Sequence, residues 1–563
     1  MLKILIDFYR IYLFQFKKKI IFIQIISVLN SVLQLLSILS FGPLILFFSG
    51  NEILSKNKYL NFILNQNIEA FNLVFIVAII FVLSNLLNIY VAKVTLKTGH
   101  QIGAILGNLF FKQVLSNNLI NENSKNFQII NSLNIEITRI TNGIIIPLLY
   151  ISSKFSNVFF IFLGLIIINF QLAFVSLLFL LSVYLIILYF FRKRFKINSE
   201  IISYQSSQRQ KIISESIYNF RETIIFKLED LFIKQFNSAN KQYFRGISKN
   251  QFLSSVPRNI IEIFLFSILI YLIYFLYTSS LLMGTLPIIG IYIVALYKLL
   301  PSLQNIASSY ASIKSNINAW KNVLPIISKK EKTRKLDFKN YEINKIEISN
   351  LNFSFGSKII FQDTSINLEE GKIIGIVGTT GIGKTTFFDL LCGFLQSKKI
   401  RIKINNNKIF NDLNEFDLKS HVSLVTQKPL VLNNSVIKNI SFEEKENVDQ
   451  KKIEFVSKIC DLDFIENLPN KWNTIIGEKN SQLSSGQIQR ISIARAIYSD
   501  NKILLLDEPT NNLDPYTEDK IMNNLTKLKK GRIIILISHN LENLKNCDKV
   551  YKIHNKKFEE YVK

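Results

Sequence analysis

The N-terminal half of the chain contains long apolar stretches in which no residue carries a charge. Asp, Glu, Lys and Arg are all absent from residues 20–50, 70–92, 155–191 and 263–297. A helix needs about 20 apolar residues to cross the hydrocarbon core of a bilayer. The first two stretches therefore predict one membrane span each, and the longer last two predict a helical hairpin each. The pattern indicates six spans in all.

Turns within the two hairpins are expected where polar or glycine residues interrupt the apolar run, at residues 169–171 and 283–285. The connectors at about 93–142 and 192–258 have few glycines and carry apolar residues three and four positions apart. This spacing is typical of helices, and a structureless segment of that length would be unusual in a folded chain. We therefore expect the membrane helices to extend well beyond the bilayer.

Basic residues indicate on which side of the membrane each connector lies. They precede the first span, follow the second and follow the fourth, as Lys17, Lys18, Lys19, Lys93, Lys97, Lys112, Arg192, Lys193, Arg194 and Lys196. Cytoplasmic loops carry an excess of Lys and Arg. The N-terminus, both long connectors and everything after the sixth span are therefore expected in the cytoplasm, with the chain as a multi-pass protein of the cell membrane.

Beyond about residue 340 the pattern changes to short apolar runs that alternate with helical segments. The runs begin at Lys345, Ile373, Val422, Lys502 and Ile533. Short continuous runs of Ile, Leu and Val are typical of buried parallel strands. The sequence therefore predicts a polytopic α-helical membrane domain of the six-span type at 1–320, a charged linker at 321–342, and an α/β domain at 343–563.

The net charge of +26 raises the question of a nucleic-acid partner. Lys, Asn and Ile are frequent throughout the chain, and no motif that reads DNA or RNA stands among them. We attribute the charge to biased composition and membrane-flanking residues, and expect no nucleic-acid partner. The three cysteines, Cys392, Cys460 and Cys547, have unrelated spacing, which predicts reduced thiols and no metal site.

A complete phosphate-binding loop follows the strand-like run that ends at Val377. Residues 378–385 read Gly-Thr-Thr-Gly-Ile-Gly-Lys-Thr and match G-x-x-x-x-G-K-[ST] at every fixed position. Glycines let backbone N–H groups turn toward phosphates, Lys384 adds a positive charge, and Thr385 is a ligand for Mg²⁺. The loop residues predicted to bind ATP are Gly378, Thr379, Thr380, Gly381, Ile382, Gly383, Lys384, Thr385 and Thr386.

A second apolar run ends in two neighbouring carboxylates, Asp507 and Glu508. The first, at the tip of a buried strand, is placed to hold Mg²⁺, and the second to polarise an attacking water. Two further polar residues each follow a strand-like run, Gln427 after the run at 422–425 and His539 after the run at 533–537. The ends of these strands therefore supply candidate catalytic and metal-binding side chains.

The segment Leu483-Ser-Ser-Gly-Gln487 begins another helical run. Backbone N–H groups of Ser484 and Gly486 at a helix start would suit a γ-phosphate. Together with the phosphate loop, Gln427, Asp507-Glu508, the 511–514 segment and His539, it resembles the nucleotide-binding domain of ATP-binding-cassette (ABC) transporters, in the same order over about residues 345–555. The family's usual LSGGQ is LSSGQ here, with Ser485 at a glycine position.

The resemblance implies roles for single residues. Glu508 would be the general base, His539 would contact the γ-phosphate, and Gln427 would sense Mg²⁺ and act with Thr385 and Asp507 in holding it. Other nucleotide contacts would come from Ser484, Ser485, Gly486 and Gln487 across a dimer, and from Asp514 at the dimer contact. Phe355 would stack on adenine. The alternative is that Phe355 is a strand core residue and Phe353 faces the base.

The family resemblance also implies a dimer, because the LSSGQ segment acts on ATP held by a second chain. Six spans ahead of one ATPase domain resemble the half-transporters among ABC exporters, which work by alternating access, and a homodimer is favoured over pairing with a different half. A looser resemblance is to bacterial lipid-linked oligosaccharide flippases. The alternatives are a peptide or multidrug exporter and an ATP-gated regulatory member of the family.

Polar residues inside the apolar stretches are the candidates for contacts with an amphiphilic substrate. A stripe along the first span comprises Ser27, Asn30, Ser31, Gln34 and Ser37, and it faces either a cavity or a neighbouring helix. Lys298 lies at the end of the last apolar stretch and Arg258 precedes it. Intramembrane cations are functional candidates, with Lys298 reaching the cytoplasmic interface as the alternative.

Overall fold

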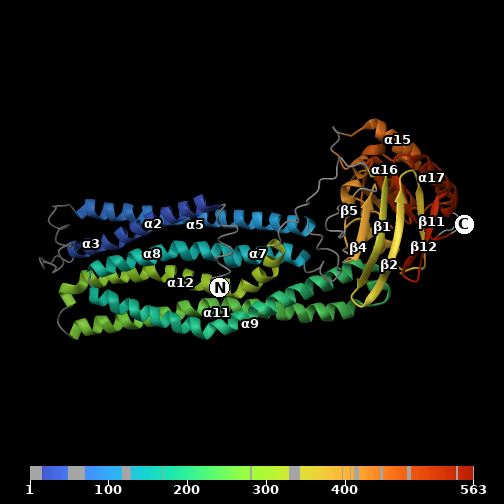
Figure 1. The fold of residues 1–563 in the computed structure, drawn as a ribbon. Coiled ribbons are helices and arrows are strands. Elements are labelled where there is room, and N and C mark those ends of the chain that lie inside the picture. Colours follow the sequence, from blue (N-terminus) through green and yellow to red (C-terminus); the bar gives the residue numbers. More distant parts are fainter. Residues whose placement is uncertain are drawn as a thin grey trace. The chain divides into compact units, whose positions relative to one another are not determined.

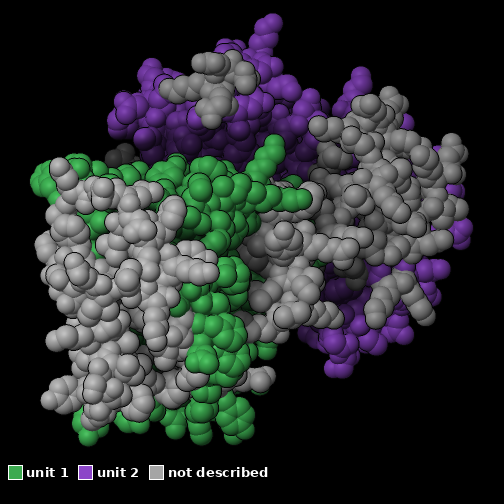
Figure 2. All heavy atoms as spheres, turned by 90° about the vertical axis from the view of Figure 1, so that its left-hand side faces the viewer, with its two compact units in different colours: residues 1–332 green, residues 333–563 purple. Residues whose placement is uncertain are grey.

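The computed structural model divides the chain into two compact units, residues 1–332 and 333–563 (Figure 2). The structure describes residues 16–48, 70–116, 129–168, 170–278, 282–328, 343–395, 397, 399–405, 408–410, 418–443, 448–477, 483–539 and 543–561. The first unit is helical and the second combines helices with three sheets.

The first unit is built from long helices that run side by side (Figure 1). They are α2 (Lys17–Leu39), α3 (Phe41–Phe48), α5 (Ala70–Ser116), α7 (Ile137–Ile140), α8 (Ile146–Ile168), α9 (Phe170–Tyr218), α10 (Phe220–Ile225), α11 (Glu229–Thr278) and α12 (Leu282–Ile327). Short π-helical segments precede and follow α7. At 1.5 Å per residue the 49 residues of α9 span about 73 Å, more than twice a hydrocarbon core. The helices therefore extend well beyond a bilayer, as expected for the connectors.

Within the described residues, three helical stretches are long and apolar enough to cross a membrane, Lys17–Ile45, Phe71–Ser116 and Ile129–Ile168. The other expected spans lie in α9, α11 and α12, where parts of the apolar stretches fall outside the described residues. The six-span arrangement therefore stays a prediction.

Two boundaries differ from those expected. The second hairpin was expected to turn at 283–285, but these residues lie in the first turn of α12, because a single glycine near a helix start costs only about 1 kcal/mol. The linker was expected from 321, but α12 continues to Ile327. Val323 and Ile327 are buried beside Trp320, so this turn still packs in the first unit.

The second unit contains a six-stranded sheet in the order β12-β11-β3-β10-β9-β6. These strands are β3 (Ile373–Val377), β6 (Val422–Val425), β9 (Ile503–Asp507), β10 (Ile533–Ile537), β11 (Lys549–His554) and β12 (Lys557–Glu560). β11, β3, β10, β9 and β6 pair in parallel. Four of the five expected runs thus lie next to one another in this sheet.

The fifth run, at Lys345, is not one of the buried parallel strands, which corrects the expectation. It forms β1 (Lys345–Phe355), which pairs antiparallel with β2 (Lys358–Glu369) and β4 (Lys399–Ile404), with β5 (Lys408–Phe410) at the edge. Its polar residues alternate with buried Ile346 and Ile348, as in a sheet with one face on the core. The alternation was visible in the sequence and favoured this sheet.

β10, in the middle of the sheet, is apolar at every position because each of its faces packs on a separate core. Ile533, Ile535 and Ile537 of β10 belong to a core shared with β1, β2 and α13 (Lys384–Leu391). Ile534 and Leu536 belong to the core beneath α15 (Gln450–Cys460), α16 (Ser485–Tyr498) and α17 (Pro515–Leu528) (Figure 1). Successive side chains of a strand point to opposite faces, so both layers hold the sheet in place.

Candidate nucleotide site

The phosphate loop connects β3 to α13, as the motif requires. Gly381 and Gly383 have φ angles of +79° and +121°, which residues with a side chain rarely adopt. A Cβ on Gly383 would lie 2.5 Å from Ile360 Cγ2 and 3.3 Å from the Phe361 ring. Thr379 and Thr380 are exposed, and Ile382 packs on the core. The loop is thus anchored at Gly383 and Ile382 and open at its tip.

Lys384 begins α13 and lies against the loop. Its Nζ donates to the carbonyl oxygens of Gly378 at 2.8 Å and Thr379 at 3.3 Å. Burial lowers the pKa of this ammonium, while the nearby carboxylates of Glu508 and Asp507 act in the opposite direction. A cation is therefore held inside the loop, with acidic groups beside it.

Asp507 ends β9 and accepts a hydrogen bond from Thr385 Oγ1 at 3.1 Å. The Asp507 side chain is buried, and burial raises the pKa of its carboxyl group. Mg²⁺ prefers oxygen ligands and often takes one or two from protein with the rest from phosphate and water. A hydroxyl and a carboxylate at the loop fit that donor set, so Thr385 and Asp507 are suitable to hold the ion.

Glu508 is held in a left-handed backbone conformation, with φ of +50°, and its N–H donates to Ile537 O at 3.0 Å. The buried carboxylate accepts from Gln427 Nε2 at 2.8 Å and from Asn511 Nδ2. His539 Nε2 lies 2.7 Å from its other oxygen. Non-glycine residues with positive φ cost free energy and cluster at functional sites, which is consistent with a fixed catalytic carboxylate.

The strand order explains why these side chains meet. His539 follows β10 and lies 3.3 Å from Lys384 Nζ, and Lys384 follows β3. Glu508 follows β9 and Gln427 follows β6. Because β3, β10, β9 and β6 are parallel neighbours, their carboxyl ends lie at one edge of the sheet, where open α/β sheets bind ligands.

The LSSGQ segment forms the start of α16. Ser484 is the N-cap, and its Oγ accepts from Gln487 N at 3.2 Å while Gln487 Oε1 accepts from Ser484 N at 2.9 Å. Gly486 lies so close to Asn512 that a Cβ would sit 2.6 Å from its carbonyl oxygen. Ser485 is exposed, so its side chain fits within a single copy of the chain. Within the described residues, none of the hydrogen bonds of this segment reaches the phosphate loop.

Phe355 and Asp514 lie apart from the carboxylate cluster. Phe353 packs on the core, whereas Phe355 is 51% exposed and meets the Phe353 ring edge to face at 4.9 Å. This favours Phe355 as the ring available to a base. Asp514 is the N-cap of α17, and hydrogen bonds from Thr517 lower the pKa of its carboxyl group.

Two features of the site were missed by sequence reasoning. Asn511 contacts Glu508, although the sequence analysis used it only as part of the 511–514 segment. The reciprocal bonds of Ser484 and Gln487 form a capping box, and the spacing S-x-x-Q was a readable signal for it.

The polar stripe of α2 faces neighbouring helices. All five residues of the stripe are buried. Ser27 donates to Ser153 of α8 at 2.9 Å, and Ser31 donates to Asn157 of the same helix. Asn30 donates to Asn88 of α5 at 3.4 Å. The alternative of interhelical hydrogen bonding therefore holds in this structure.

Lys298 of α12 lies against α5. Its Nζ is 3.4 Å from Ser84 Oγ and 4.7 Å from the centre of the Phe81 ring. One turn further along α5, Asn88 Oδ1 accepts from Lys154 Nζ of α8 at 2.9 Å. The sequence analysis did not single out Lys154, which directly precedes the third apolar stretch.

The side chain of Arg258 lies outside the described residues, although its backbone belongs to α11. Glu262 follows Arg258 by one helical turn, a spacing at which opposite charges pair. Among the described side chains of the first unit, neither Lys154 nor Lys298 lies within ion-pair distance of a carboxylate. Lys154 and Lys298 thus both contact α5, at polar residues one helical turn apart.

Comparison with known proteins bears on both units. Residues 361–511 match the family model described as ABC transporter. A probable ABC transporter ATP-binding/permease protein of Haemophilus influenzae is 33% identical over 260 residues, 44% of this chain and 47% of that protein. An ATP-dependent lipid A-core flippase of Wigglesworthia glossinidia brevipalpis is 29% identical over 380 residues, 66% of this chain and 64% of that protein.

Among solved structures, a bacterial Atm1-family ABC exporter with ATP bound has a TM-score of 0.77 with this chain. The match covers 96% of this chain and 94% of that chain at 19% sequence identity. At this identity the likeness establishes the fold. The part of the chain that aligns with the Haemophilus protein spans about half of that relative, 47% of its length.

Proposed function

Because this chain carries an ABC transporter domain behind a helical unit with the fold of an ABC exporter, we propose that it is one half of an ATP-driven exporter. The observation that carries the proposal is the meeting of Lys384, Glu508 and His539 at one sheet edge. Lys384 and the loop N–H groups would hold the phosphates, and Thr385, Asp507 and Gln427 would hold Mg²⁺. The ion would supply neutralisation of the phosphate charge.

The carboxylate of Glu508 then takes the proton of the attacking water. Gln427 and Asn511 fix the orientation of this carboxylate by donating to it. His539, between Glu508 and Lys384, is placed to donate to the γ-phosphate as charge develops there. A group held in this way loses little freedom at the moment of reaction, which is how positioned bases accelerate hydrolysis.

We also propose that two copies of the chain form the working unit. The capped start of α16 presents Ser484, Ser485, Gly486 and Gln487 to a nucleotide, yet the described hydrogen bonds of this segment do not reach its own phosphate loop. A second copy would bring the segment to that loop, with Asp514 at the contact. Glu508 and His539 are both present, so each of two identical sites would hydrolyse ATP.

Mixing two inactive variants tests the dimer. Chains with Lys384→Ala lack the phosphate cation, and chains with Ser484→Arg block the partner's site. Only the mixed dimer contains one site with two intact halves, so the mixture should recover part of the Mg²⁺-dependent ATPase activity that each variant lacks alone. A fully active monomer by mass measurement in detergent would defeat the proposal.

The substrate class we propose is an amphiphile with an anionic group, such as a lipid-linked oligosaccharide. Lys154 and Lys298 approach one face of α5 at residues one turn apart. Ammonium groups without a carboxylate partner inside a membrane domain are suited to hold a phosphate or pyrophosphate. A peptide or multidrug exporter is the alternative, and an ATP-gated regulatory protein is disfavoured because the Glu508 carboxylate is in place.

Transport in proteoliposomes tests the substrate class. Lys154→Gln with Lys298→Gln should lower the flipping of a lipid-linked pyrophosphate while basal ATPase activity persists. Arg258→Gln is the comparison, because Glu262 stands one turn away from Arg258. Unchanged flipping by the double lysine variant would return peptide or neutral-drug export to equal standing.

We propose a cell-membrane location with the N-terminus and the ATPase unit in the cytoplasm. The basic residues around the predicted spans support this orientation. Protease added to sealed inside-out vesicles should remove the second unit, and protease added to right-side-out vesicles should leave it intact.

A further inference from the structure

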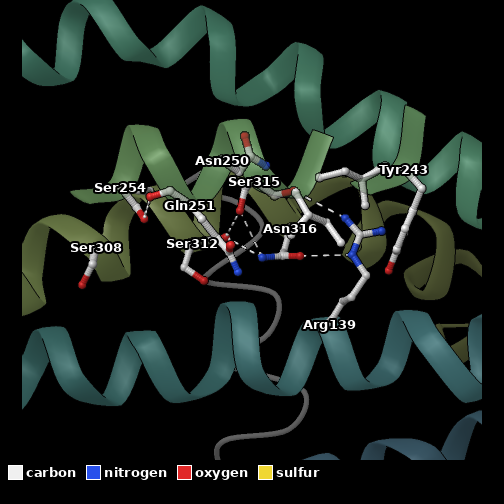
Figure 3. A pocket seen from close by; sticks show the side chains of 12 residues that line it. Arg139, Tyr243, Asn250, Gln251, Ser254, Ser308, Ser312, Ser315 and Asn316 are labelled. Atoms are coloured by element: carbon white, nitrogen blue, oxygen red, sulfur yellow. Dashed lines mark hydrogen bonds between the residues drawn. The ribbon is translucent and has the colours of Figure 1, made fainter. Parts of the chain in front are cut away.

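A pocket of about 240 Å³ lies in the first unit, and neither Lys154 nor Lys298 is among its described lining residues. It is lined by residues of α7, α9, α11 and α12. Figure 3 shows Arg139 at one end and the side chains of Asn250, Gln251, Ser312 and Asn316 around the pocket. Eight of the twelve described residues that line it carry a hydroxyl or amide group, whereas the cores of this helical unit are built mainly from Ile, Leu and Phe.

Among the described residues that line the pocket, Arg139 is the one with a charge, and the protein neutralises it. Arg139 Nη1 donates to both oxygens of Glu136 at 3.1 Å and to Ser203 Oγ at 2.8 Å, and Nε donates to Asn316 Oδ1 at 3.1 Å. Glu136 is fully buried. The guanidinium is therefore committed to a buried ion pair and to neighbouring side chains. The described lining therefore offers no unpaired charge to a ligand.

The remaining groups present both hydrogen-bond acceptors and a donor. Ser254 and Ser308 donate their hydroxyl hydrogens to carbonyl oxygens of their own helices, at 2.7 and 3.2 Å, so their lone pairs are left to accept. Asn250 accepts from Asn198 at 2.9 Å through Oδ1. Its Nδ2 has no partner among the described residues, although the residue is only 9% exposed. A buried donor of this kind costs free energy unless a ligand or water satisfies it.

We propose that this pocket binds a neutral polyhydroxylated ring, a sugar of the substrate head group. A hydroxyl both donates and accepts, whereas a phosphate only accepts and an ammonium only donates. The volume is below the roughly 300 Å³ at which drug-sized sites begin, which suits one ring. This inference rests on the proposed export of an amphiphile and adds the chemistry of its head group.

The position of the pocket along the helices fits a head group in contact with water. Ser308 lies 26 residues after Leu282, the first residue of α12. At 1.5 Å per residue this is about 39 Å along the helix, beyond a hydrocarbon core of about 30 Å. A sugar would reach the pocket from the aqueous side on which the proposed ATPase unit lies.

Cysteine protection in nanodiscs without nucleotide tests the pocket. Ser312→Cys places a thiol in the lining, and the native cysteines, Cys392, Cys460 and Cys547, are buried and give little background. Octyl glucoside below its micelle concentration should slow the labelling of this thiol by a methanethiosulfonate reagent. Octyl phosphate and octylammonium are the charged comparisons. Ser238→Cys, on the exposed side of α11 and outside the predicted spans, is the matched control and should label at the same rate with each probe.

Adding Ser254→Ala should raise the half-protecting concentration of octyl glucoside roughly fivefold, the effect of losing one hydrogen bond. Ser238→Ala should leave that concentration unchanged. Protection by octyl phosphate at lower concentration than by the glucoside, or no protection by any probe, would overturn the proposal. Since the assay contains no ATP, its failure leaves the ATPase and dimer proposals standing. Conversely, if the protein showed no ATPase activity but octyl glucoside still protected the thiol, the ATPase proposal would fail and the pocket proposal would stand.

Discussion

Replacing Glu508 by Gln removes the proposed base with little change in shape. The side chain keeps one oxygen that can accept from Gln427, and the new amide can donate to His539 when Nε2 of that ring is unprotonated. The phosphate loop and Lys384 are untouched. The substitution therefore isolates proton transfer from nucleotide binding.

The expected loss in ATP turnover is about 10²–10⁴-fold, which corresponds to about 3–5 kcal/mol in the activation barrier. The lower end applies when the Glu508 carboxylate serves mainly to position the water, and the upper end when it accepts the proton of that water. Affinity for ATP should stay within about threefold of the parent value, because the cation and the loop N–H groups are retained.

Phosphate release from purified protein in nanodiscs measures turnover, and a fluorescent ATP analogue measures binding. Glu454→Gln, on the exposed face of α15, is the matched control and should behave as the parent. Turnover at the parent rate in Glu508→Gln would refute the assignment of the base. A parallel loss of binding would show instead that the carboxylate supports the shape of the loop.

Two further predictions concern the second unit. Ser484→Ala should cost about 1 kcal/mol through the lost N-cap and speed hydrogen exchange in the first turn of α16, whereas Ser485→Ala should not. Burial raises the pKa of Asp507 above its value in the unfolded chain. The contribution of this group to the free energy of unfolding is therefore largest at acid pH, and it is lost as pH rises through the pKa of the folded state. Asp507→Asn should therefore raise the melting temperature of the nucleotide-free protein at pH 7. The difference in melting temperature between variant and parent should vanish at acid pH. Mg²⁺-ATP should no longer stabilise the variant.

The parts of the nucleotide site that could be predicted from sequence are those encoded by consecutive residues. The phosphate loop, Asp507-Glu508 and the LSSGQ segment each combine a strand or helix with the polar residues at its end. The backbone of Glu508, with its positive φ, is hydrogen-bonded to Ile537 O of β10, which lies beside β9 in space, so no local pattern indicated this conformation. The pairing of β1 with β4 likewise depends on a partner farther along the chain, whereas β2 directly follows β1.

In the first unit the sequence identified which residues are polar but not what they face. The stripe on α2 has the spacing of one helix face whether it lines a cavity or meets another helix. Only the packing of α2 on α8 decides between them, through Ser27 with Ser153 and Ser31 with Asn157. Lys154 was overlooked for the same reason, because its importance comes from Asn88 on α5.

These contacts predict which helices move together during transport. Hydrogen bonds between buried side chains inside a membrane domain have little water to replace them, so separating α2 from α8 would leave several polar groups unsatisfied. α9 and α11 are joined by a buried bond of Asn198 with Asn250 and by an exposed bond of Gln205 with Gln242. We expect α2 with α8, and α9 with α11, to move as pairs while the surfaces between the pairs rearrange.

A disulfide between α2 and α8 tests this directly. Ser27 Oγ and Ser153 Oγ are 2.9 Å apart, so Ser27→Cys with Ser153→Cys places two thiols side by side. Oxidation should link the pair and leave ATPase activity and transport within about twofold of the reduced protein, because the bond joins helices that never separate. The single variants under the same oxidant are the control. A block in transport that a reductant reverses would show that α2 and α8 part during the cycle, and the hydrogen bonds between them would then mark one conformation rather than a permanent pair.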